Sequence, residues 1–249
     1  MIVLGIDPDL HHTALAWVVV EHLGSPTPRV KVEEIRIVHV PEPKQGGPKG
    51  QEAAVEMLRE LRYLWSSYDR DPMHPSMRFV KVVAEGQQVY KRKLSAKKGR
   101  ADGRAEGGAG KVDPAHLLRL ALVSGAAMAG ALDRIPAAEA VVPLPAEWKG
   151  TVPKDVYHAD VCTALGWSWD VGGSRREPRI VPRGAGVVPL LNQRGRPAPS
   201  SAWIHALDAI GLALWGVSSV WRSVLVDRPG RGSVPRPPDP DGLLSAGRT

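Results

Sequence analysis

Two acidic side chains stand at the ends of segments that are otherwise strongly apolar. Asp7 follows the run "IVLGI", and Glu85 follows "FVKVVA". A run that is apolar at almost every position is typical of a central strand buried on both faces. If the two strands are parallel neighbours, both carboxylates emerge at the carboxyl edge of the sheet, where ligands of open α/β sheets bind.

A second pair of ionisable side chains, His205 and Asp208, lies in the segment "SAWIHALDAIGLALWGVSSVWR". A helix that is apolar on nearly all sides is a buried helix, and residues three positions apart share a face. Because a buried carboxylate needs a cation or strong hydrogen-bond donors, a divalent metal ion is a suitable partner. The sequence therefore predicts a metal site made of Asp7, Glu85, His205 and Asp208.

Each of these residues also has a purely structural explanation. An Asp before a proline, like Asp7, is a common turn former, and Glu85 before a glycine can be a solvated strand end. His205 can donate a hydrogen bond to Asp208 in a satisfied structural pair. We favour the metal site, because the structural explanations require four independent coincidences.

Other candidate ligands are weaker. The adjacent pair His11 and His12 lacks the i, i+4 spacing of a helical zinc site and is expected in a solvated turn. His158 and Asp160 are expected on a partly exposed helix, with Asp160 as a weaker auxiliary ligand. Cys162 lies in an apolar helical run and is expected to be a core thiol.

Residues 91–111 form a run without hydrophobic periodicity that is rich in Gly and in basic side chains. We expect a flexible loop that contacts phosphate groups and begins six residues after Glu85; the alternative is a solvated charged face. Tyr90 at its root can stack on an unpaired base or pack on the rim of the sheet. The basic residues of the loop are Lys91, Arg92, Lys93, Lys97, Lys98, Arg100, Arg104 and Lys111.

Hydrophobic periodicity predicts an α/β domain around these residues. Three sequential strands, at 2–6, 13–20 and 30–40, suggest an antiparallel meander, and a fourth strand ends at Glu85. The other expected elements are helices at 51–68, 114–133, 152–167 and 201–222, a last strand at 138–145, and a hairpin across the turn "PRGAG". Residues 1–226 are expected to form one domain, and residues 227–249 a Pro-rich disordered tail.

The composition limits the class of protein. With 249 residues, 43% hydrophobic content and a formal net charge of +7, the chain can bury a core and favours an anionic partner such as nucleic acid. A single cysteine excludes an internal disulfide framework and favours a reducing compartment. No stretch approaches about 18 uninterrupted apolar residues, so we expect a soluble cytoplasmic protein without a membrane partner.

Three segments together resemble the RuvC-type Holliday junction resolvases, which are nucleases of the RNase H-like superfamily. The segments are "GIDPDLHHTALAW", "VVAEGQQVY" and "IHALDAIGLALW". In element order the resemblance covers residues 1–221, and it is strongest at these three motifs. It implies an RNase H-like α/β fold, with a mixed five-stranded sheet flanked by helices.

The resemblance also implies an activity. The family's four metal ligands correspond to Asp7, Glu85, His205 and Asp208, which implies two Mg²⁺ or Mn²⁺ ions per active site. Such a site would hydrolyse a phosphodiester and leave a 5′-phosphate nick. The implied partners are branched DNA, above all four-way junctions, and a second copy in a homodimer. The implied setting is DNA recombination and repair, in a bacterial cell or a phage-infected host.

The sequence departs from the family pattern at several points. The aromatic wedge expected three residues after the glutamate is Gln88 here, and Tyr90 is the nearest substitute. Residues 168–200 look like an insertion, and the basic segment before the last helix is represented by Lys149 and Lys154. These features suggest a divergent member, such as one encoded by a bacteriophage.

Two functions of other classes compete with nuclease activity. A catalytically silent junction- or RNA-binding module could keep the same fold and the basic loop; divalent-dependent nicking would discriminate it. An ATP-binding relative of the actin and sugar-kinase type also begins with a strand that ends in Asp. That function requires duplicated domains and Gly-rich adenosine loops, for which 249 residues leave no room.

Overall fold

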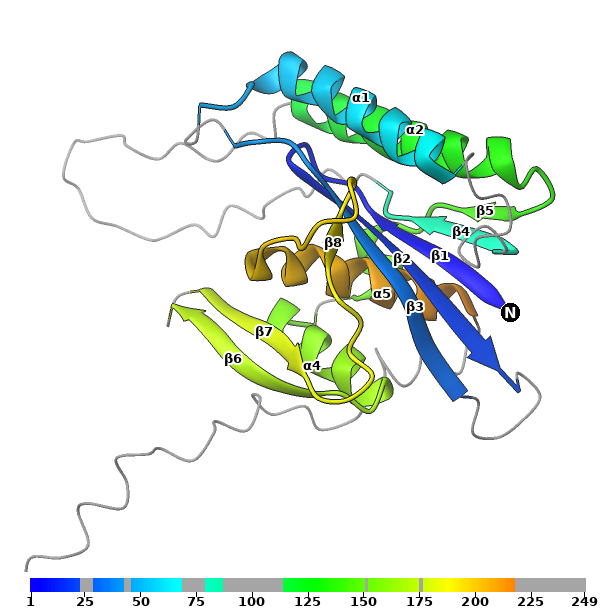
Figure 1. The fold of residues 1–249 in the computed structure, drawn as a ribbon, viewed down its shortest axis with the longest axis vertical. Helices are drawn as coiled ribbons and strands as arrows, with labels where there is room; N and C mark the ends of the chain where they lie inside the picture. Colours follow the sequence, from blue (N-terminus) through cyan, green and yellow to red (C-terminus); the bar gives the residue numbers. More distant parts are fainter. Residues whose placement is uncertain are drawn as a thin grey trace, which may run out of the picture.

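A mixed β-sheet forms the centre of the computed structural model, which describes residues 1–22, 29–42, 46–68, 79–86, 114–150, 152–174 and 177–217. The strand order is β5-β4-β1-β2-β3-β8 (Figure 1). The strands are β1 (Ile2–Asp7), β2 (His12–Glu21), β3 (Arg29–His39), β4 (Lys81–Ala84), β5 (Glu139–Val141) and β8 (Leu191–Asn192).

The directions of the strands confirm the predicted fold class. β1, β2 and β3 form the expected antiparallel meander, while β4 runs parallel to β1 and β5 runs parallel to β4. The pattern β3-β2-β1-β4-β5, with helices on both faces, is the mixed sheet flanked by helices that was expected from the sequence. The expected number of five strands needs one correction, because the two-residue strand β8 pairs in parallel with the edge strand β3.

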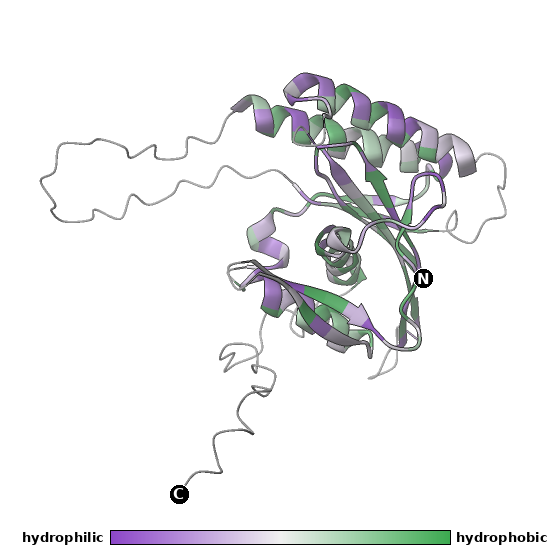
Figure 2. Cartoon of the chain, turned by 60° about the vertical axis from the view of Figure 1, so that its left-hand side comes forward, coloured by the Kyte–Doolittle hydropathy of each residue, from purple (hydrophilic) through white to green (hydrophobic). Residues whose placement is uncertain are grey.

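Two layers of helices enclose the sheet. On one face lie α1 (Gly50–Tyr68) and α2 (Pro114–Arg134), and on the other lies α5 (Trp203–Val217) (Figure 1). Beyond α5 are α4 (Lys154–Ala164) and a two-stranded sheet of β6 (Ser168–Ser174) and β7 (Glu177–Arg183). The short elements are α3 (Pro145–Trp148) and the 3-10 turn Ser200–Ala202. Figure 2 shows the apolar helix α5 enclosed between the sheet and this outer layer.

Glycine residues allow α5 to lie directly on the sheet. A Cβ atom added at Gly5 in β1 would stand 1.9 Å from the backbone oxygen of Ala209, and one added at Gly216 would stand 2.4 Å from Val83 Cγ2. Such separations are far below van der Waals contact, so only glycine permits this approach. The absence of these two side chains brings the last helix against β1 and β4, the strands that lead to the predicted acidic residues.

The predicted hairpin has a different turn from the one expected. In the structure Val171 pairs with Ile180. Strand β6 ends at Ser174 and strand β7 begins at Glu177, well before "PRGAG". Gly184 and Gly186 in that segment do adopt positive φ values, of 103° and 93°. Their turn follows the end of β7 and does not join two strands, so the predicted pairing was wrong.

The other predicted elements match the structure within a few residues. The helices predicted at 51–68 and 114–133 are α1 and α2, and the final helix is described as far as Val217. Tyr90, the basic loop at 91–111 and the tail at 227–249 lie outside the described residues, so their expected roles stay predictions.

Helix α2 is long and apolar enough to cross a membrane by length and composition, although only about a fifth of it is buried. It packs against the core through Val123, Ala127 and Ala131. Leu118 and Leu122 remain 72% and 53% exposed on its outer face. Part of the apolar surface of α2 is therefore exposed to solvent in a single copy of the chain.

Candidate active site

Asp7 and Glu85 lie side by side at the ends of two neighbouring parallel strands. Asp7 is the last residue of β1, and Glu85 directly follows β4. The strands are in register at Ile6 and Ala84, and the backbone N–H of Glu85 donates to the Ile6 carbonyl at 3.1 Å. The structure thus brings both carboxylates to the same carboxyl edge of the sheet, as the sequence pattern of the two strands predicted.

Helix α5 brings His205 and Asp208 to this edge. Nδ1 of His205 lies 2.9 Å from Oδ2 of Asp7, in a hydrogen bond that joins the last helix to the first strand. Asp208, one turn further along α5, is almost completely buried. All four residues proposed as metal ligands therefore gather in one region of the structure.

The two carboxyl oxygens of Asp208 have different partners on α4. Nε2 of His158 lies 3.0 Å from Oδ1, and Nζ of Lys154 lies 2.5 Å from Oδ2. Burial would raise the pKa of Asp208, but the hydrogen bond from His158 and the charge of Lys154 hold it well below its usual range. Asp208 is therefore an ionised carboxylate, although it is buried.

The structure corrects the expected environment of His158. The sequence predicted a partly exposed helix, yet the His158 side chain is only 3% exposed and faces α5. The i, i+4 spacing of Lys154 and His158 was a signal that both side chains share one helix face. It could not reveal which partner that face contacts, because α4 and α5 are distant in the sequence.

Glu85 lies in an environment that disfavours its charge. Burial and the charge of Asp7 raise its pKa to about 7, and the positive charge of Lys149 only partly opposes them. The Lys149 ammonium lies 3.8 Å from Oε1 of Glu85 and 4.7 Å from the centre of the Trp148 ring. A hydrogen bond with Asp7 raises the pKa of Glu85 further.

A stack of histidine rings borders the site. The rings of His12 and His205 are 5.5 Å apart and inclined by only 11°, and the ring of His39 lies 4.8 Å from that of His12. Burial and the charges of His205 and His39 lower the pKa of His12 to about 4, so its ring is neutral at physiological pH. His12 begins β2 and is partly buried, so the expected solvated turn was wrong for this residue.

Cys162 has the expected role. It is buried in the core beneath α5, and burial raises the pKa of its thiol to about 12. A thiol with this pKa is neither a nucleophile nor a metal ligand at neutral pH.

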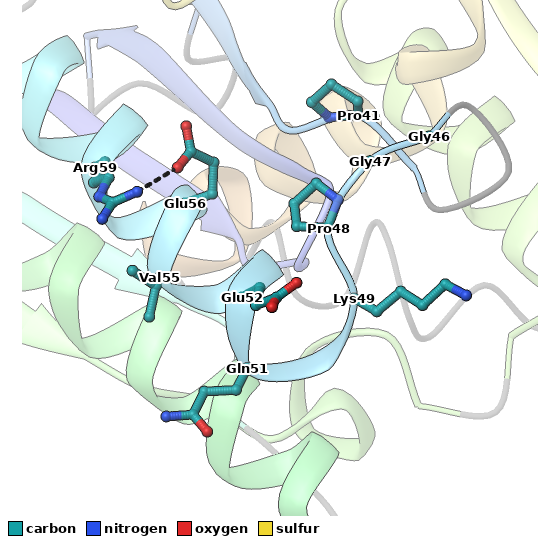
Figure 3. A pocket seen from close by; sticks show the side chains of 10 residues that line it. All are labelled: Pro41, Gly46, Gly47, Pro48, Lys49, Gln51, Glu52, Val55, Glu56 and Arg59. Carbon is teal, nitrogen blue, oxygen red and sulfur yellow. Dashed lines mark hydrogen bonds and ion pairs between the residues drawn. The ribbon is translucent and has the colours of Figure 1, made fainter.

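As the side chains lie, no three His, Cys, Asp or Glu residues within the described parts of the chain are grouped to hold a metal ion. In the structure Lys154 contacts Oδ2 of Asp208, and His205 contacts Oδ2 of Asp7. A cavity of about 1040 Å³ lies elsewhere, at the start of α1, and is lined by Gly47, Lys49 and Glu52 among others (Figure 3). None of the four predicted ligands lines it.

Comparisons with known proteins give similarity at the level of structure. No family model matches the sequence, and no curated protein gives a significant match. Thermus thermophilus RuvC shares 18% identity over 86% of this chain and 92% of its own, with a TM-score of 0.46. T. thermophilus RuvC in complex with Holliday junction substrate shares 16% identity over 90% of this chain and 97% of its own, with a TM-score of 0.49. These are similarities of fold alone: the chain is an α/β protein with a mixed sheet flanked by helices, and its structure is similar to that of RuvC.

Proposed function

We propose that this protein is a divalent-metal-dependent endonuclease that nicks branched DNA and resolves Holliday junctions, leaving 5′-phosphate ends. The observation that carries the proposal is the convergence of Asp7, Glu85 and Asp208 from two parallel strands and a buried helix. Burial and the charge of Asp7 disfavour the ionised form of Glu85, and a bound cation would favour it.

The donor set fits a divalent cation by its chemistry. Carboxylate oxygens suit Mg²⁺, and the imidazole of His205 makes Mn²⁺ an alternative. The raised pKa of Glu85 supports this fit, because burial and the charge of Asp7 both disfavour its ionised form, which a bound cation would stabilise. Asp7, Glu85, Asp208 and His205 would hold up to two ions. Divalent ions bound there would lower the pKa of an attacking water and stabilise the charge on the leaving oxygen.

The protein's own side chains have separate tasks in this proposal. His205 orients the Asp7 carboxylate through its hydrogen bond. Lys149, beside Glu85, and Lys154, beside Asp208, bring positive charge to the edge of the acidic cluster. This charge would attract the phosphate that is to be cleaved and offset its repulsion by the carboxylates.

The basic loop at 91–111 would bind the DNA backbone in this proposal. It begins six residues after Glu85, so even a fully extended chain keeps its start within about 20 Å of the site. Its eight basic side chains would contact phosphate groups, and Tyr90 would stack on an unpaired base at the junction.

The outer face of α2 supports a homodimer as the active form. Leu118, Leu122, Gly125 and Ala129 are exposed and follow one another at four-, three- and four-residue intervals, which places them on one stripe of the helix. A two-fold axis across this stripe would cover it with the same stripe of a second copy. We propose that this contact forms a dimer whose symmetry fits a four-way junction, in the cytoplasm of a bacterial or phage-infected cell.

A catalytically silent junction- or RNA-binding module is the alternative function. The contact of Lys154 with Asp208 favours it, because a lysine that stays in place would occupy the carboxylate. Incubation of labelled four-way junction, flap and linear duplex with Mg²⁺ and Mn²⁺ discriminates the two. The nuclease proposal predicts metal-dependent nicks with 5′-phosphate ends, mainly in the junction. Tight junction binding without nicks in either metal would establish the silent module.

A further inference from the structure

The Asp208 carboxylate is held at both oxygens by two residues that differ in their freedom to move. The His158 side chain, on Oδ1, is 3% exposed and packed beneath α5. The Lys154 side chain, on Oδ2, is 42% exposed. A lysine side chain with that exposure can move its ammonium group into water by rotation of its flexible stem, whereas a ring enclosed by the core cannot leave.

The hydrogen bond between His158 and Asp208 has a defined polarity. The ion pair with Lys154 makes Asp208 a carboxylate that can only accept, so Nε2 of His158 donates its proton to Oδ1. This donor fixes the rotation of the Asp208 carboxylate within α5. A histidine that holds a carboxylate through one oxygen leaves the other oxygen at a constant position.

Lys154 lies where a cation would interact with the whole acidic cluster. Its Nζ lies 2.5 Å from Oδ2 of Asp208, and the charges of Asp7 and Glu85 also act on it. Its ammonium thus supplies positive charge to the same three groups that would bind a divalent ion.

We propose that His158 is a positioning residue that fixes Oδ1 of Asp208, so that Oδ2 is the oxygen presented to a metal ion, and that Lys154 occupies Oδ2 until the metal displaces it. The proposal rests on the proposed function, because it assumes that Asp208 is a metal ligand. It adds two residues of α4 to the site and assigns each oxygen of Asp208 a separate task.

The test is calorimetric titration of the full-length protein with Mn²⁺, without DNA, so that it has a readout other than cleavage. Loss of a group that orients a metal ligand typically weakens metal binding about 10- to 100-fold. We therefore expect His158→Ala to raise the Mn²⁺ Kd by about that factor, and His158→Gln, which keeps an N–H donor, to recover most of the affinity. Lys154→Met should bind Mn²⁺ several-fold more tightly than the wild type, because it removes the competing charge.

A matched control is His22→Asn. His22 is exposed at the far end of β2 and has a positive φ of 55°, which Asn tolerates. It should bind Mn²⁺ like the wild type. An unchanged Mn²⁺ Kd in folded His158→Ala would make His158 a packing residue and overturn the proposal. If His158→Ala does not fold, the other two variants test the proposal. Weak Mn²⁺ binding by natively folded His158→Gln would overturn the proposal. Mn²⁺ binding by Lys154→Met that is no tighter than in the wild type would also overturn it.

The result also separates this inference from the proposed function. A wild-type protein that binds Mn²⁺ but nicks no DNA would refute the nuclease, while the Mn²⁺ affinities of the His158 and Lys154 variants would still decide the positioning role. A protein that nicks junctions but shows equal Mn²⁺ affinity in all variants would refute only the positioning role. Absence of Mn²⁺ binding by the wild type would refute the positioning role directly.

Discussion

Nδ1 of His205 lies 2.9 Å from Oδ2 of Asp7, although 198 residues separate them in the chain. The contact exists because α5 lies against β1 at Gly5, where no side chain keeps the helix away. It joins the first strand and the last described helix at the edge of the sheet where Glu85 also lies. The candidate site is therefore a product of the packing of α5 on the sheet as much as of its acidic residues.

The first prediction concerns the His205 side chain. Burial lowers its pKa, but the hydrogen bond and charge of Asp7 outweigh this and raise the pKa above its ordinary value. A metal binds only the neutral imidazole, so metal-supported cleavage should decrease as the pH falls through a value above about 6.5. His205→Asp should retain cleavage, extend it to lower pH and shift the preference from Mn²⁺ toward Mg²⁺, as measured by nicking rates from pH 5.5 to 8.5.

His205→Ala serves as the comparison for this variant. It should lose most of the activity, because it supplies neither a ligand nor a partner for Asp7. If the Ala variant kept the wild-type rate, pH profile and metal preference, His205 would be a packing residue.

The second prediction follows from the raised pKa of Glu85. The pKa is about 7 in the folded protein against 4.5 for an ordinary glutamate. Its favourable contribution to folding is therefore complete below about pH 4.5 and is lost as the pH rises through about 7. In EDTA, the Tm of the wild type relative to that of Glu85→Gln should decrease between pH 5 and 8. Addition of Mg²⁺ should restore part of this lost Tm in the wild type and not in the variant. Parallel Tm curves for both proteins in EDTA would contradict the assigned environment.

The third prediction tests the close approach of α5 to β1. Gly5→Ala would place a Cβ atom 1.9 Å from the backbone oxygen of Ala209, so either α5 or β1 must move. Overpacking of this kind typically costs about 1–3 kcal/mol, and here it also shifts His205 and Asp208 away from Asp7. We expect a lower Tm and a loss of cleavage. Gly172→Ala in β6, where the nearest side-chain atom would be 3.5 Å away, is the control and should change neither much.

The fourth prediction concerns the exposed stripe of α2. Leu122→Glu should convert the dimer into a monomer at micromolar concentration in analytical ultracentrifugation, without loss of folding, because Leu122 is 53% exposed in the single chain. Val171→Glu, at a similarly exposed position of β6, should remain a dimer. A wild-type protein that sediments as a monomer would refute the proposed dimer.

The central strands and the four residues that gather at the candidate site were accessible from sequence for a common physical reason, while their role as metal ligands stays a prediction. A buried strand or helix is apolar at nearly every position, so an acidic or imidazole group within or beside it is conspicuous, as at Asp7 and Asp208. Glu85 was recognisable in the same way, and the parallel pairing of β4 with β1 places it beside Asp7.

Contacts between distant helices were not accessible in this way. His158 and Lys154 lie on a helix of mixed polarity, and no local pattern shows that their common face meets Asp208. The turn of the β6–β7 hairpin was also misplaced, because the glycines of "PRGAG" mark a true turn that nevertheless lies outside the hairpin. Strand β8 was missed because two residues are too short to show periodicity.

The measurement that tests the central claim most directly compares the wild type with Asp7→Asn on a labelled four-way junction, with and without Mg²⁺. Asn keeps the size of the side chain but lacks the negative charge with which Asp7 would help to hold the cations, so nicking should be abolished in Mg²⁺ and in Mn²⁺. Junction binding should be unchanged or tighter, since the variant removes a negative charge that repels phosphate. An Asn variant that nicked the junction at close to the wild-type rate in Mg²⁺ would contradict the assignment of Asp7 and with it the metal-dependent nuclease.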